Sequence, residues 1–192
     1  MSSAAEQAAQ RKGAMKRSLV IALYASSLRA ARSFSASANR SPRVLVPIAS
    51  GSEEIETSCI TDTLTRFGAE VTVASCEPGS TRCVMSRGLR VQAEVTIDEV
   101  AHVEFDLIAL PGGMPGAETL RDCKTLTAML RSQSPRLVGA VCAAPAVILG
   151  THGLLPDEAT CYPAPHFREV IKGERSDDAT DNSSFATCFA RC

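Results

Sequence analysis

Cys142 lies where a strand is expected to turn directly into a helix. The apolar run 137–141 before it has the pattern of a buried strand, and Pro145 and Gly150 after it match a helix start and end. A cysteine at such a turn forms a nucleophile elbow, where the free N–H groups of the helix start favour the thiolate. The alternative is a buried, unreactive core cysteine.

A glycine-rich loop, residues 111–116, follows a second apolar run, residues 105–110. Its glycines allow backbone N–H groups to come close to a ligand, although the loop could also be a tight turn without one. Because ligands of open α/β sheets bind at the carboxyl ends of the strands, we expect this loop and Cys142 to face one site.

A carboxyl group, that of Glu56, is expected at the same edge. It lies in the first turns of a helix that begins at about Ser52, the predicted N-cap, and ends before Gly68. Burial beside a thiolate would keep Glu56 protonated and donating to the sulfur, whereas a solvated helix glutamate is the alternative. We therefore predict that the pKa of Cys142 is lowered, that Cys142 is alkylated before the other cysteines, and that removing Glu56 raises this pKa.

Strands and helices alternate along the part of the chain that must position these residues. The opening strand–helix–strand unit predicts a parallel sheet. Strands are expected over 44–48, 70–75, 105–110, 137–141 and 160–162, a small hairpin over 83–93, and helices over 52–67, 124–133 and 143–150.

The first 42 residues differ in composition from the rest. They are rich in Ala, Ser and Arg, and Glu6 is their single acid. We interpret residues 1–42 as a mitochondrial presequence cleaved after Phe34. A plastid transit peptide is one alternative, and a disordered tail on a cytosolic protein is another.

Composition excludes several classes of function. The chain has 20 Lys and Arg against 21 Asp and Glu, but residues 1–42 hold seven of the basic residues and a single acid. The body is therefore acidic, and no basic surface for nucleic acid is expected there. The 8 cysteines form no C-x-x-C pair, so we expect free thiols and no metal site. No apolar run has membrane-spanning length.

Three segments in order, residues 44–57, 106–113 and 139–145, closely resemble the ThiJ/PfpI superfamily. The match is to the branch that holds the parkinsonism-associated protein deglycase and the cofactor-independent, glyoxalase III-like enzymes, and it covers roughly residues 43 to 171. It implies an α/β, flavodoxin-like three-layer sandwich with a mostly parallel sheet, usually a homodimer. It also implies that no cofactor is needed.

The resemblance further implies a reactive Cys142, a protonated Glu56, and an oxyanion or substrate site made of the backbone N–H groups of Gly112, Gly113 and Ala143. Such proteins convert methylglyoxal or glyoxal and reverse early glycation adducts, in protection against carbonyl and oxidative stress. Attack by the thiolate gives a hemithioacetal, and the neutral acid then moves a proton between carbons. The alternative is a redox sensor or chaperone that uses oxidation of Cys142.

The chain departs from the superfamily pattern at one position near the site, and it lacks the characteristic residues of two related enzyme classes. Tyr162 occupies the position where many members carry a histidine, and His166 is nearby. Ala143 replaces the histidine that follows the cysteine in the protease-like branch, which argues against a peptidase. The His-x-Glu pair of class I amidotransferases is missing.

The last residues do not match the superfamily. The expected further strands, Gly-Pro-Gly-Thr loop and closing helix are absent, so we interpret residues 43–172 as a domain incomplete at its C-terminus. Residues 173–192 are predicted to be a disordered or aberrant tail, because Gly173 begins a polar, acidic run. An exposed sheet edge, uncovered apolar surface and lowered stability would follow.

Overall fold

The structure is a computed structural model that describes residues 40–156, 159–171 and 187–191. Nearly all of the predicted presequence, residues 1–42, lies outside these ranges, so its targeting role stays a prediction. Among the described helices, none is long and apolar enough to cross a membrane.

Short apolar runs form the strands, and segments with helical spacing of apolar residues form the connections between them. In chain order the elements are β1 (Arg43–Ile48), α2 (Glu54–Arg66), β2 (Glu70–Ser75), β3 (Arg82–Val84), β4 (Arg90–Gln92), β5 (Val95–Thr96), the 3₁₀ turn η1 (Ile97–Val100), β6 (Leu107–Leu110), α3 (Gly116–Asp122), α4 (Lys124–Arg131), β7 (Leu137–Val141), the π-helix η2 (Pro145–Gly150), α5 (Pro165–Ile171) and β8 (Thr187–Arg191).

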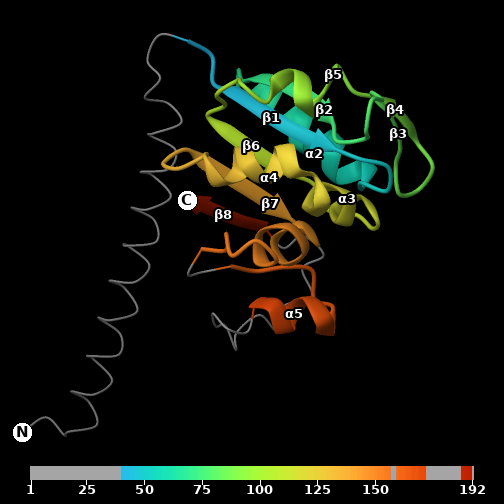
Figure 1. Cartoon of the computed structure of the whole chain (residues 1–192), viewed down its shortest axis with the longest axis vertical. Helices are drawn as coiled ribbons and strands as arrows, with labels where there is room; N and C mark the ends of the chain where they lie inside the picture. Colours follow the sequence, from blue (N-terminus) through green and yellow to red (C-terminus); the bar gives the residue numbers. More distant parts are fainter. Residues whose placement is uncertain (1–39, 157–158, 172–186, 192) are drawn as a thin grey trace, which may run out of the picture. The chain divides into compact units, whose positions relative to one another are not determined.

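A mostly parallel sheet runs through the centre of the fold, with the strand order β5-β2-β1-β6-β7-β8 (Figure 1). In its register Val44 of β1 lies between Val71 of β2 and Leu107 of β6, and all pairs from β5 to β7 are parallel. Strands β3 and β4 form a separate antiparallel hairpin. The parallel order brings the carboxyl ends of β1, β6 and β7 to one edge.

Helices cover both faces of this sheet, as expected for a flavodoxin-like α/β fold (Figure 1). Helix α2 packs against β1 and β2, whereas η2 packs against α3 and α5. Side chains alternate between the faces: Leu45 and Ile108 join the main core cluster with residues of α3, α4 and η2, while Leu107 and Ala109 face α2. The functional loops therefore extend from a framework whose central strands, β1 and β6, are almost entirely buried.

The end of the chain differs from the prediction. Residues 187–191, expected in a tail without structure, form β8 and pair antiparallel with β7, from Leu137↔Arg191 to Val141↔Thr187. The physical reason is that the outer edge of β7 presents N–H and C=O groups that need partners. The prediction is wrong for these five residues, and residues 172–186 and 192 lie outside the described ranges.

The predicted strand over residues 160–162 is also wrong. This segment is irregular: the N–H of Tyr162 donates to the carbonyl of Cys142 at 2.7 Å, and Pro163, which has no N–H, follows at once. Helices α3 and α5 are present where the sequence predicted none, and the helix after Cys142 is a π-helix.

Candidate active site

The turn after β7 places Cys142 in a strained backbone conformation. Its φ is 57°, and it is the one non-glycine residue with a positive φ in the part of the chain that the structure describes. The chain bends there because β7 ends at Val141 and the carbonyl of Ala143 already accepts the N–H of Val147 at 2.9 Å. The sharp strand-to-helix turn expected from the sequence is therefore present.

Helix α2 carries Glu56 into the same region. Its N-cap is Glu53, whose carboxylate accepts the N–H of Glu56 at 2.8 Å. Ser52, the residue predicted as the cap, instead accepts the N–H of Ala49 at 3.0 Å. The Glu56 side chain is only 7% exposed, which is rare for a glutamate without a partner.

Two groups hold the Glu56 carboxyl. The N–H of Gly112 donates to its Oε2 at 2.7 Å, and the side chain of Cys142 is its second hydrogen-bonding partner. Burial raises the pKa of Glu56, the two hydrogen bonds oppose that rise, and the charge of Glu53 adds to it. Glu56 and Cys142, distant in the sequence, are thus in direct contact.

Gly112 is required for this close approach. A Cβ atom there would lie 2.9 Å from both the backbone nitrogen of Ala143 and the Cβ of Cys142, and 3.0 Å from Oε2 of Glu56. Its N–H is bound to Glu56, so it is not free to hold an oxyanion as the sequence-based hypothesis supposed. Gly113 and Ala143 are the residues whose N–H groups point at the Cys142 sulfur.

The pKa of Cys142 is raised, whereas the sequence predicted that it is lowered. Burial and the negative charge of Glu56 raise it to about 12, although the N–H groups of Ala143 and Gly113 act to lower it. The expected effect of the helix start exists, but it is outweighed by an ionised carboxylate beside a half-buried sulfur. The pKa values of both groups are thus raised, because the thiol and the carboxyl are buried together and do not ionise independently.

A cavity of about 260 Å³ opens above the Cys142 side chain. The residues that line it are Glu53, Ser86, Arg87, Gly113, Met114, Cys142, Ala143, Tyr162 and Phe167. Tyr162 therefore reaches the site, whereas His166 is not among the lining residues and its ring lies 4.1 Å from that of Phe167.

The hairpin turn between β3 and β4 contributes residues that sequence reasoning missed. Glu54 of α2 accepts the hydroxyl of Ser86 and the N–H of Arg87, each at 2.8 Å, and so fastens this turn over the cavity. Desolvation is the largest single influence and acts to raise the pKa of Glu54, but the hydrogen bonds that its carboxylate accepts together outweigh it and lower that pKa. The acid at the start of α2 was the one sequence signal for this contact. That signal was ambiguous, because a helix start favours an acidic residue whether or not it has a partner.

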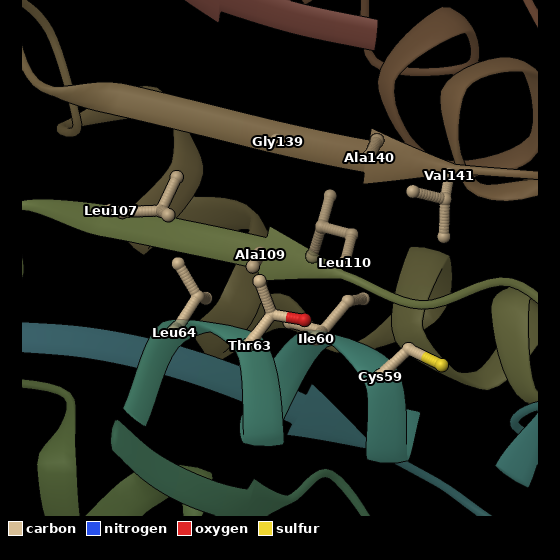
Figure 2. Close-up of a pocket in the computed structure, with 10 residues that line it drawn as sticks. All are labelled: Cys59, Ile60, Thr63, Leu64, Leu107, Ala109, Leu110, Gly139, Ala140 and Val141. Atoms are coloured by element: carbon tan, nitrogen blue, oxygen red, sulfur yellow. The ribbon is translucent and has the colours of Figure 1, made fainter. Parts of the chain in front are cut away.

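A second cavity, of about 240 Å³, lies between α2 and the strands β6 and β7 (Figure 2). It is lined by Cys59, Ile60, Thr63, Leu64, Leu107, Ala109, Leu110, Gly139, Ala140 and Val141. Figure 2 shows the α2 side chains pointing toward the two strands. This lining has almost no polar atoms, so the cavity offers no chemistry of its own.

Within the described ranges, no group of three or more His, Cys, Asp or Glu side chains could hold a metal ion. The arrangement that can do chemistry is thus a thiol that lines a cavity, a carboxyl in contact with that thiol, and two backbone N–H groups beside the sulfur. Such a set can form a covalent bond to a carbonyl carbon and move one proton.

Known proteins are similar to this chain in sequence and in fold. "Protein DJ-1 homolog B" of Arabidopsis thaliana is 46% identical over 140 residues, which cover 69% of this chain and 31% of that protein. "Glutathione-independent glyoxalase DJR-1.2" of Caenorhabditis elegans is 35% identical over 127 residues, 65% of this chain and 66% of that protein. The chain thus spans about a third of the plant relative's length.

The solved structures agree. The structure titled "Toxoplasma gondii DJ-1, oxidized" has a TM-score of 0.66 and 46% sequence identity, and the match covers 71% of this chain and 75% of that one. "Crystal structure of Drosophila melanogaster DJ-1beta" has a TM-score of 0.56 and 36% identity over 59% of this chain and 61% of that one. Residues 42–181 also match the model of the DJ-1/PfpI family, so the chain belongs to the DJ-1/PfpI family.

Proposed function

We propose that this chain is a cysteine-dependent, cofactor-free glyoxalase and deglycase that acts on methylglyoxal, glyoxal and their early adducts. The observation that carries the proposal is the contact between the buried Glu56 carboxyl and the thiol of Cys142, a residue that lines the cavity. The C. elegans relative, which bears the name of a glutathione-independent glyoxalase, supports the reaction class.

The first step includes a proton transfer within the pair. Glu56 accepts the proton of the Cys142 thiol while the sulfur attacks the aldehyde carbon, and the carbonyl oxygen becomes the oxyanion of a hemithioacetal. The N–H groups of Gly113 and Ala143, which point at the sulfur, are the nearest donors for the developing oxyanion. Glu56 is now neutral, as the family resemblance implies for the active form.

The second step is an internal rearrangement that needs no redox cofactor. A proton passes from the former aldehyde carbon to the neighbouring carbon, which turns the hemithioacetal into a thioester of a 2-hydroxy acid. Water then cleaves the thioester, releases lactate from methylglyoxal and restores the thiol. We assign this proton transfer to Glu56, because its carboxyl is in contact with Cys142. Glu56 first returns its proton to the oxyanion; as a carboxylate it then takes the proton of the former aldehyde carbon and delivers it to the neighbouring carbon, while the hydroxyl proton moves to the neighbouring oxygen.

Lactate formation from methylglyoxal tests this function. We expect the Cys142→Ser variant to lose activity to the background rate, whereas Cys59→Ser, a substitution at an exposed cysteine outside the active-site cavity, keeps it. Activity should fall on acidification with a midpoint above the ordinary glutamate pKa, since burial raises the pKa of the base Glu56. Equal lactate formation by wild type and Cys142→Ser would refute the enzyme and leave oxidation of Cys142 as the alternative function.

A further inference from the structure

Two loops beside the active site are in contact backbone to backbone. One is the β1–α2 loop, residues 49–53, and the other is the glycine-rich loop after β6. A Cβ atom on Gly113 would lie 2.6 Å from the carbonyl oxygen of Gly51, so no side chain fits between the loops there. The N–H of Glu53 also donates to the carbonyl of Gly112 at 3.0 Å. A displacement of the β1–α2 loop would therefore displace the glycine-rich loop as well.

The glycine-rich loop in turn places two backbone donors at the reacting groups. The N–H of Gly113 points at the sulfur of Cys142, and the N–H of Gly112 donates to the carboxyl of Glu56 at 2.7 Å. Catalysis is sensitive to misplacement of such groups by about 1 Å. The position of the β1–α2 loop is thus part of the geometry of the active site.

A carboxylate outside both cavities holds the β1–α2 loop. Glu77 lies two residues beyond the end of β2, and its Oε1 accepts the N–H of Ser50 at 2.7 Å. The N–H of Glu77 donates to the hydroxyl oxygen of Ser75, a fully buried residue, at 3.1 Å. A short hydrogen bond from a backbone N–H to a carboxylate is among the stronger ones in proteins. Glu77 therefore connects the loop to the end of a core strand.

The hairpin of β3 and β4 supports the same loop. The N–H of Gly51 donates to the carbonyl of Val84 at 2.8 Å, and the N–H of Ser86 donates to the carbonyl of Ser52 at 2.9 Å. These hydrogen bonds join backbone groups, so they remain possible when the side chain of Glu77 is replaced. Loss of that side chain should therefore loosen the loop at Ser50 without unfolding the domain.

We propose that Glu77 is a positioning residue of the active site: through Ser50 it holds the β1–α2 loop against the glycine-rich loop and so fixes Gly113 beside Cys142. This inference rests on the proposed function, in which the N–H of Gly113 is a donor to the developing oxyanion. Without the carboxylate, the N–H of Ser50 needs a new partner and the loop shifts to find one. Because an oxyanion donor acts on the transition state, kcat should fall while KM changes little.

The kinetics of lactate formation from methylglyoxal test this role. With kcat expressed per folded molecule, Glu77→Ala should lower kcat about tenfold, less than the loss of a whole oxyanion donor. Glu77→Gln should keep kcat within about threefold of the wild type, because its amide oxygen still accepts the N–H of Ser50. Glu70→Ala, at an exposed glutamate at the start of β2, is the matched control and should behave as the wild type.

Hydrogen exchange tests the same linkage without turnover. In Glu77→Ala, exchange should become about tenfold faster in peptides that cover residues 49–53 and 111–116, and it should stay unchanged in α4 and in Glu77→Gln. If the wild type forms no lactate, the proposed function fails, and the exchange rates still decide whether Glu77 holds the two loops. Unchanged exchange over residues 111–116, a uniform rise over the whole chain, or a kcat of Glu77→Ala equal to that of an active wild type would each overturn the inference.

Discussion

Cys142 and Cys123 occupy comparable positions and have opposite properties. Each is partly buried, each precedes a helical segment, and two backbone N–H groups point at each sulfur. Yet the pKa of Cys142 is raised to about 12 and that of Cys123 is lowered to about 6. The surroundings of each sulfur make the difference: burial and the charge of Glu56 raise the pKa of Cys142, whereas a hydrogen bond with Cys76 lowers that of Cys123.

A helix start does not by itself decide the pKa of the cysteine beside it. Backbone N–H groups lower the pKa of both thiols, but a helix N-terminus contributes only modestly unless other groups act with it. A neighbouring carboxylate or a hydrogen-bond donor in contact is worth more, because the interaction is direct and partly shielded from water. The same local motif thus leaves one thiol with a raised pKa and the other with a lowered pKa.

The largest expected effect is in the order of alkylation at pH 7. Cys123 should react with iodoacetamide about a hundredfold faster than Cys142, since its larger thiolate fraction outweighs the lower nucleophilicity of a more acidic thiol. Site-resolved peptide mass spectrometry measures both rates in one sample. Faster alkylation of Cys142 would agree with the prediction from the sequence that this cysteine reacts first. It would contradict the difference in pKa between Cys142 and Cys123.

The next effect is that of Glu56→Gln on Cys142. Removing the carboxylate charge while keeping the shape should lower the pKa of Cys142 by about 1–3 units, the usual effect of a nearby like charge. The pH dependence of Cys142 alkylation measures this shift, and that of Cys123 should stay unchanged as the internal control. An increase in the Cys142 pKa would instead mean that Glu56 is protonated at rest and donates to a thiolate.

The smallest effect is expected from Asp98→Asn, which removes the negative charge facing Cys123. Its pKa should fall by less than about 1 unit, since the Asp98 charge is the weakest of the influences on this thiol and the amide oxygen can still accept the Thr125 hydroxyl. Alkylation of Cys123 between pH 4 and 8 measures the change. A rise in the pKa would show that Asp98 acts through the position of the helix rather than through its charge.

Much of the framework could be read from local patterns. Continuous apolar runs predicted β1, β2, β6 and β7, and Pro145 with Gly150 predicted a helix directly after Cys142. These predictions are confirmed because each depends on neighbours within one turn or one strand. The family followed from three motifs whose order and spacing are specific, and the match over residues 42–181 confirms it.

Predictions that depended on distant partners were less successful. Gly112 was assigned to the oxyanion site, but its N–H is used by Glu56, 56 residues away. Residues 187–191 were assigned to a tail, yet they pair with β7. In both cases the outcome depends on which buried or edge groups need a hydrogen-bond partner, which local composition does not reveal.

The sequence by itself thus determined the four inner strands β1, β2, β6 and β7, the helix α2, the sharp turn at Cys142 and the family. Only the tertiary structure decided the charge state of the thiols, because a pKa depends on burial and on the groups that folding brings within a few ångströms. Glu56 reaches Cys142 across 86 positions, and Cys76 reaches Cys123 across 47. Separations of this length are bridged by the parallel sheet and its crossing helices, which no local pattern encodes.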